Sequence, residues 1–244
     1  MYHRVEWTPE RIQRFWNFHT GSAATREAYF SRRFGRAIIH LARRRAKLAG
    51  PVVDFGCGPG DLVEELLRLG FPCKAIDVSA EAVAHVQKRF AGHPGFLGAF
   101  VGRPERLPLQ DDEAGAIFLI EVLEHLTPDT AGLACAEFRR VLWPGGHLIV
   151  TVPNEEDLQA NAVACPDCGC IFHRMQHVQR FSRESLSEWL VGVGFEPIFV
   201  ARLHLKHFAG SWMIRPFGLL KHLARRLRHR SNPHLFAIAR LLPT

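Results

Sequence analysis

The stretch Val52-Val53-Asp54-Phe55-Gly56-Cys57-Gly58-Pro59-Gly60-Asp61 decides the fold of this chain. Apolar, β-forming residues lead into three glycines spaced as G-x-G-x-G, and a helix-like pattern begins at Asp61. Because glycine lacks a Cβ and tolerates positive φ, a strand, glycine turn and helix in this order let a ligand approach the bare backbone. Asp54, just before the turn, suits a ligand with positive charge better than the pyrophosphate that the longer G-x-G-x-x-G spacing binds.

On both sides of this turn, short apolar runs alternate with helix-like stretches, which is typical of a parallel sheet covered on both faces. The expected strands are Pro51–Phe55, Pro72–Asp77, Phe96–Val101, Ala116–Glu121, His147–Val152, Phe195–Leu203 and His234–Leu242. The expected helices are Asp61–Leu69, Ala80–Phe90, Asp129–Leu142 and Ser182–Val193. Two further helices, separated near Gly21, are expected between about Thr8 and Lys47.

The glycine turn and four later segments, in this order, resemble the class I S-adenosylmethionine-dependent methyltransferases. These segments are Ala75–Ser79, Gly102–Pro108, Ile117–Leu126 and Arg140–Val150. The resemblance implies an α/β, Rossmann-like fold whose seven-stranded sheet is mostly parallel, with an antiparallel last strand and a helical N-terminal cap. It also implies S-adenosyl-L-methionine as cofactor. The residues that it assigns to that cofactor are Asp54, Gly56, Cys57, Gly58, Gly60, Asp77, Val78 and Glu121, with Asp77 at the ribose hydroxyls.

These patterns divide the chain into three parts. Residues 1–48 form the helical cap, and residues 49–204 with 232–244 form the methyltransferase domain. A basic amphipathic insertion occupies residues 205–231. The N-terminus lacks the apolar core of a secretory signal and no apolar run is long enough to span a bilayer, so a cytoplasmic location is expected.

Methyl transfer to a hydroxyl requires a base as well as a held donor. Glu121 and His125 follow the fourth strand, at the edge where open α/β sheets bind ligands. His177 lies in a segment that resembles the acceptor-pocket stretch of small-molecule methyltransferases. The candidate catalytic residues are therefore His177, His125 and Glu121, and the expected reaction is O-methylation of a small-molecule, lipid-linked or glycan acceptor. The Asn/Asp-Pro-Pro-aromatic motif of DNA N6-amino methyltransferases does not occur here.

A second informative stretch runs from Cys165 to His177. Cys165 and Cys168 have the Cys-x2-Cys-Gly spacing of a zinc knuckle, and two thiolates so spaced can hold one tetrahedral ion. Cys170 and His173 are the further candidate ligands for Zn²⁺. The alternative is a cysteine-bearing turn without metal. His173 and His177 together could also complete the zinc site with C-x2-C-x4-H-x3-H spacing, but His177 would then be unable to act as the base.

Charge is concentrated in the last part of the chain. The net charge is +7, nine of the 31 Lys and Arg residues follow Glu196, and no Asp or Glu does. Residues 212–230 therefore predict a basic amphipathic helix that could lie on an anionic membrane surface, which would make the protein peripheral on the inner face of the membrane. The alternatives are an ordinary surface helix and, less favoured, a site for an acidic acceptor or RNA. A nucleic-acid partner is not expected, because the rest of the chain has fewer basic than acidic residues.

One competing function remains at this stage. Arg103, Pro104 and Gly115 stand where the resembled family frequently has an acid, a residue with a backbone N–H and another acid. These departures motivate a non-catalytic, methyltransferase-like module that is stabilised by zinc and associated with a membrane. The intact glycine turn and Asp77 favour the enzyme.

Overall fold

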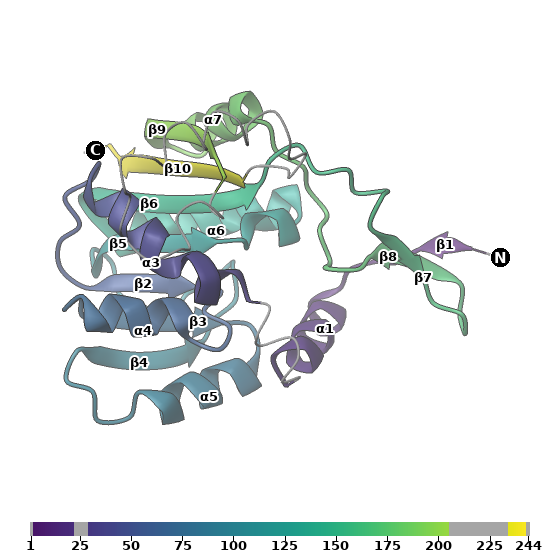
Figure 1. Ribbon diagram of the computed structural model, residues 1–244, viewed down its shortest axis with the longest axis horizontal. Coiled ribbons are helices and arrows are strands. Elements are labelled where there is room, and N and C mark those ends of the chain that lie inside the picture. The colour runs from purple at the N-terminus through teal and green to yellow at the C-terminus, as the bar shows by residue number, and fades with distance from the viewer. Residues whose placement is uncertain (1, 22–28, 205–233, 243–244) are drawn as a thin grey trace, which may run out of the picture.

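The computed structural model describes residues 2–21, 29–204 and 234–242, and a seven-stranded sheet forms its centre (Figure 1). The strand order is β4-β3-β2-β5-β6-β10-β9. Neighbouring strands from β4 to β6 are parallel, whereas β10 runs antiparallel to both β6 and β9. The predicted mostly parallel sheet with an antiparallel last strand is confirmed. The strands are β2 Val52–Phe55, β3 Cys73–Asp77, β4 Phe96–Val101, β5 Ala114–Ile120, β6 Leu142–Pro153, β9 Phe195–Leu203 and β10 His234–Leu241.

The glycine turn follows the central strand β2, whose four residues are all buried. Its side chains alternate between the two faces of the sheet. Val53 and Phe55 belong to the hydrophobic core that α6 (Pro128–Val141) and α7 (Arg183–Gly192) cover. Val52 belongs to the core on the opposite face. The helices there are α3 Phe30–Arg43, α4 Asp61–Arg68 and α5 Ala80–Arg89.

Local capping explains where these helices begin. The Ser79 hydroxyl accepts a hydrogen bond from the Ala82 backbone N–H at the start of α5. At the start of α7, Ser182 and Ser185 each accept a hydrogen bond from the other's backbone N–H, so the partial capping-box match in the sequence is a reciprocal capping box. Such caps satisfy backbone donors that the first turn of a helix leaves unpaired.

A second sheet, which the sequence patterns did not predict, lies beside the first helix. Its order is β1-β8-β7, with β1 at His3–Arg4, β7 at Ala162–Ala164 and β8 at Cys170–His173. Figure 1 shows it projecting beyond α1 (Pro9–Gly21), away from the central sheet. The N-terminal part of the chain is therefore a short strand as well as the predicted helices, and it pairs with a hairpin more than 160 residues further along the chain.

Gly115 has a structural explanation that the sequence did not reveal. A Cβ at this position would lie 1.8 Å from the Ala49 carbonyl oxygen and 2.3 Å from the Trp143 ring. Gly115 belongs to β5, which begins at Ala114, two residues before the predicted Ala116, and the strand packs closely against Trp143 at this position. A larger residue cannot occupy this position without moving the backbone.

The basic insertion falls outside the described residues, so the amphipathic helix predicted at 212–230 stays a prediction. Among the helices of the described ranges, none is long and apolar enough to cross a membrane.

Candidate active site

A cavity of about 690 Å³ opens at the carboxyl ends of β2, β3 and β5. The order of the central strands reverses between β2 and β5, and open α/β sheets bind ligands at such switch points. The glycine turn, the ends of β3 and β5, the loop at 101–105, the short 3₁₀ helix η1 (Leu123–His125) and the loop at 175–177 contribute to its lining. Helix α1 covers it with side chains that include Trp16.

The glycine turn forms one wall of this cavity. Gly56 and Gly58 adopt φ values of +80° and +48°, the left-handed region that favours glycine. Added Cβ atoms would lie 2.4 Å from Val122 and 2.5 Å from the Tyr29 ring, respectively. The absence of a Cβ at Gly56 and Gly58 therefore leaves room for the side chains of Val122 and Tyr29, as well as for any ligand. Gly60 is different, because it does not line the cavity and a Cβ there would contact Phe90 at 2.9 Å.

Asp77 ties the glycine turn to the end of β3. Its two carboxylate oxygens accept hydrogen bonds of 2.8 Å from the backbone N–H groups of Gly58 and Ser79. Burial raises the pKa of Asp77, and the same backbone hydrogen bonds oppose that rise. Asp77 and Val78 both line the cavity. Asp77, which the resemblance assigns to the ribose hydroxyls of the cofactor, therefore lies beside the glycine turn.

Asp54 lies behind the site rather than in its wall. It is only 2% exposed, it is not among the residues that line the cavity, and one carboxylate oxygen has no hydrogen-bond partner. Burial, followed by the neighbouring carboxylates of Asp77 and Asp61, raises the pKa of Asp54 to about 8. Its predicted direct contact with a positively charged ligand has no counterpart among the cavity contacts.

Glu121 marks the end of β5 with an unusual backbone. Its φ of +53° is left-handed, which is uncommon for a residue with a Cβ and occurs often at functional sites. Its carboxylate lies 3.1 Å from Nδ1 of His234, at the start of β10. Both residues line the cavity, so the last strand of the chain contributes to the site.

His125 is buried between α1 and the loop that follows β8. Its ring contacts the Trp16 and His177 rings, each with a centroid distance of 4.8 Å. The Gln176 side chain donates to the His125 carbonyl oxygen at 2.9 Å and accepts from the Trp16 indole at 2.9 Å. Burial, followed by the nearby His177, lowers the pKa of His125 to about 3. His125 is therefore neutral at ordinary pH and a weak proton acceptor.

His177 has the arrangement of an oriented base. Its Nδ1 donates a hydrogen bond to the Glu156 carboxylate, which can only accept. The proton therefore resides on Nδ1, and the lone pair of Nε2 is left to accept a proton from elsewhere. His173 stacks on the His177 ring at 4.4 Å and lies 3.4 Å from Glu156 through Nε2. Although burial opposes it, the His177 hydrogen bond lowers the pKa of Glu156.

Glu124 is a buried carboxylate beside these imidazoles. Both of its side-chain oxygens lack hydrogen-bond partners, and burial followed by the charge of Glu121 raises its pKa well above the usual range. Two groups of side chains here have ligand atoms within 4.8 Å of one another and can hold a divalent cation. They are Glu124 with His125 and His177, and Glu156 with His173 and His177.

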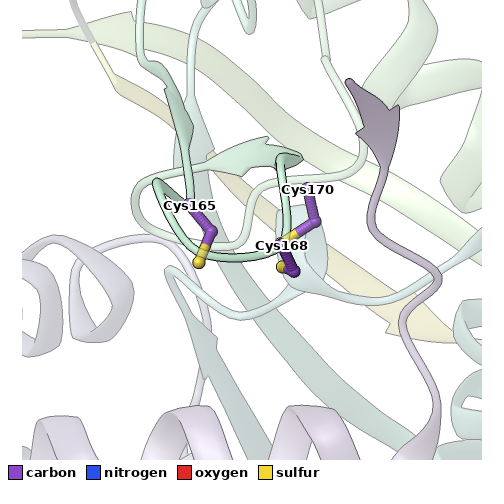
Figure 2. Close-up of side chains that lie close together, drawn as sticks. All are labelled: Cys165, Cys168 and Cys170. Carbon is purple, nitrogen blue, oxygen red and sulfur yellow. The ribbon is translucent and has the colours of Figure 1, made fainter. Parts of the chain in front are cut away.

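The predicted four-residue zinc site is divided in the structure. Cys165, Cys168 and Cys170 have sulfur atoms within 4.8 Å of one another at the β7–β8 turn (Figure 2). His173, at the other end of β8, groups with Glu156 and His177 instead.

The sequence patterns did not identify several residues that build the cavity, because nothing in their local patterns marks them. These are Trp16, Tyr29, Glu156 and Gln176.

Comparisons with known proteins find a matching family model and related sequences. A family model described as a methyltransferase domain matches residues 26–199. The mitochondrial ubiquinone biosynthesis O-methyltransferase of Mus musculus is 29% identical over 191 residues, which cover 75% of this chain and 51% of the relative. Ubiquinone biosynthesis O-methyltransferase from Cupriavidus pinatubonensis is 36% identical over 116 residues, which cover 45% of this chain and 44% of the relative. The chain thus spans about half the length of these curated relatives.

Among solved structures, a 1,6-didemethyltoxoflavin-N1-methyltransferase from Burkholderia thailandensis has a similar fold, with a TM-score of 0.65 at 18% identity. The match covers 99% of this chain and 93% of that one, whose crystals hold 1,6-didemethyltoxoflavin and S-adenosylhomocysteine. At this identity the likeness concerns the fold alone.

Proposed function

This chain belongs to the family of methyltransferase domains, and from this premise we propose that it transfers a methyl group from S-adenosyl-L-methionine to an oxygen atom of a small-molecule acceptor. The observation that carries the proposal is a single cavity whose lining includes both the glycine turn with Asp77 and the Glu156–His177 pair. The proposed donor subsite and the proposed base thus line the same cavity.

Three features of the chain fit S-adenosyl-L-methionine at the glycine turn. The volume of about 690 Å³ is in the range of sites for cofactor-sized ligands. Each Asp77 oxygen accepts one backbone hydrogen bond and retains a lone pair for a ribose hydroxyl. Gly56, Cys57 and Gly58 line the same cavity. When bound, the cofactor supplies a methyl group activated on a sulfonium, and the protein holds the reactants together and excludes water.

His177 is the base that this proposal uses. The Glu156 carboxylate holds the proton on Nδ1, so Nε2 can accept the hydroxyl proton of an acceptor as its oxygen attacks the methyl group. His125 is less suited, since its pKa of about 3 makes it a poor acceptor at neutral pH. We assign His125 to positioning, through its ring contacts with Trp16 and His177. Glu121 remains a cavity carboxylate available to either ligand.

Oxygen is preferred over nitrogen because relatives at 29% and 36% identity are named O-methyltransferases. A lipid-linked or glycan acceptor, a cytoplasmic location and an anionic membrane surface as partner for residues 212–230 stay predictions. A zinc ion at the three cysteines would be structural in this proposal, because none of the three lines the cavity.

One of the arguments for the non-catalytic alternative, the glycine at position 115, no longer applies. Gly115 is dictated by contact with Ala49 and Trp143, away from the cavity, so its replacement of an acid has a structural cause. Arg103 and Pro104 do line the cavity and still favour an altered contact at that end of the donor.

The test is calorimetric titration with S-adenosyl-L-methionine and S-adenosylhomocysteine, followed by an acceptor screen of phenolic, sugar and lipid-linked hydroxyls with product mass spectrometry. We expect both cofactor forms to bind and at least one hydroxyl class to be methylated in a His177-dependent manner. A folded protein that binds neither form would contradict the proposal and support the binding module. Methylation at nitrogen alone would contradict the assignment of oxygen.

A further inference from the structure

The turn between β7 and β8 brings three thiols together. The backbone N–H of Cys165 donates to the Cys170 carbonyl oxygen at 2.8 Å, and that of Gly169 donates to the Cys165 carbonyl oxygen at 2.9 Å. Gly169 adopts a left-handed φ of +74°, which closes the turn. Figure 2 shows the three cysteine side chains directed to the same side of this turn. Their sulfur atoms all lie within 4.8 Å of one another, and none of them forms a disulfide.

The cluster is accessible from solvent. Cys168 is exposed, and Cys165 and Cys170 are half-buried. Thiolate is the form that binds metal, and soft sulfur ligands select zinc over magnesium or calcium. A zinc ion bound by these three sulfurs at the tip of the hairpin would have one tetrahedral coordination position left for a fourth ligand.

The fourth position lies toward β1. Strand β1 pairs in parallel with β8, and His3 is directly opposite Cys170. Backbone hydrogen bonds from His3 to Gly169 and from Val5 to Ile171, of 3.2 Å and 3.0 Å, fix this register. Opposite residues on neighbouring strands project to the same face, and the strands are about 4.8 Å apart. His3 is thus on the face of Cys170, whereas His173 groups with Glu156.

We propose that Zn²⁺ binds the thiolates of Cys165, Cys168 and Cys170 together with the imidazole of His3. The His3 imidazole is outside the group of atoms within 4.8 Å, so it completes the site by rotation of its side chain toward the sulfurs. The ion then joins two segments far apart in the sequence and pins β1 against the hairpin.

This zinc site has a consequence for the cavity, and that consequence rests on the proposed function. From β1 the chain leads to Trp7, whose ring contacts Phe172 of β8 at 6.0 Å and Phe15 of α1 at 5.6 Å. Trp7 itself lines the cavity, and α1 covers it. Zinc at the hairpin would therefore hold the cover of the acceptor site in position, with no part in the chemical step.

Metal content tests the site directly. We expect about one zinc per chain in the full-length protein purified without added metal, measured by mass spectrometry of the elements, and tight uptake of zinc after chelation. Cys165→Ser and Cys168→Ser should lose the ion. The control Cys135→Ala, which changes a buried cysteine of α6, should retain it. A metal-free protein that takes up no added zinc, or a Cys165–Cys168 disulfide in its place, would overturn the proposal.

The fourth ligand has its own test. His3→Gln should weaken zinc affinity and change the spectrum of the cobalt-substituted protein, whereas His173→Gln should leave both unchanged. The reverse pattern would return the site to His173 and refute the assignment of His3. Hydrogen exchange of residues 2–7 should slow when zinc is added, because the His3 and Val5 amides bond to the hairpin. None of these readouts depends on methyl transfer, so they can succeed or fail separately from the proposed function.

Discussion

Glu156 accepts a hydrogen bond from Nδ1 of His177, and both side chains face the cavity that the glycine turn also lines. The two residues are 21 positions apart, with Glu156 before β7 and His177 after β8. A carboxylate that fixes one imidazole nitrogen as a donor leaves the other nitrogen as an acceptor, which is the arrangement a general base requires.

Replacing His177 by Asn should lower kcat by roughly 100- to 10,000-fold, because the proton acceptor is removed. Glu156→Gln should lower kcat by less, since the imidazole remains but loses its fixed tautomer. Calorimetry should give an unchanged affinity for S-adenosylhomocysteine in both variants. A His177→Asn enzyme with parental kcat would remove His177 from the base role.

Asp77→Ala should weaken S-adenosyl-L-methionine binding by more than about tenfold, because a buried charged acceptor of hydrogen bonds is lost. The variant Glu188→Ala, on the exposed face of α7, is a matched loss of a carboxylate far from the cavity. Titration calorimetry of the two variants measures the difference. Equal affinities in both would contradict the assignment of Asp77 to the donor.

The raised pKa of Asp54 predicts that the stability of the fold depends on pH. Its pKa is about 8 in the folded protein and about 4 in the unfolded chain, so between these values the folded state retains a proton that the unfolded state has lost. The contribution of Asp54 to stability is therefore present below about pH 4 and is lost as pH rises toward 8. Asp54→Asn should gain stability relative to the parent, by a few kcal/mol at pH 8 and little at pH 4.5. Urea unfolding at both pH values checks this, and a pH-independent difference would refute it.

Glu124→Gln should be no less stable than the parent in urea unfolding, because burial raises the pKa of the carboxyl well above its usual range and a neutral amide of the same shape avoids the cost of a buried charge. Its kcat should stay within a few-fold of the parental value. A different outcome is equally informative. If parental activity requires added Mg²⁺ or Mn²⁺ and this variant cannot use them, Glu124 is an ionised metal ligand, and His177 belongs to the metal site and not to proton transfer.

Gly115→Ala should destabilise the fold by about 1–3 kcal/mol, because its Cβ would overlap the Ala49 carbonyl and the Trp143 ring. Gly132→Ala is the control, since a Cβ there meets nothing within 4 Å in helix α6. The midpoint of urea unfolding measures both. Cofactor affinity should be unchanged in the folded fraction of Gly115→Ala, because the position is away from the cavity.

Local patterns were sufficient for the central sheet and for one half of the site. Alternating apolar runs predicted every strand of that sheet to within a few residues, except that β6 begins five residues before the predicted His147. Asp77 and the glycine turn could be placed together because consecutive βα units bring their carboxyl ends to one edge.

The other half depends on contacts between distant segments. Strands of two to four residues such as β1, β7 and β8 are too short to leave a periodic signal, so their pairing was not predicted. The spacing C-x2-C-x4-H suggested that His173 joins Cys165 and Cys168, but sequence spacing does not specify in which direction a side chain points. Along β8 the side chain of His173 is directed to Glu156, while the cysteines gather at the turn.

The position of β10 has a consequence for the order of synthesis. This strand follows every other described strand in the sequence, yet it lies inside the sheet between β6 and β9, and its first residue, His234, contacts Glu121 at the cavity. On the ribosome, β9 emerges earlier and has no partner to pair with until residues 234–241 leave the exit tunnel. The facing edges of β6 and β9 therefore stay unpaired until then, and His234 joins the cavity only after β10 has entered the sheet.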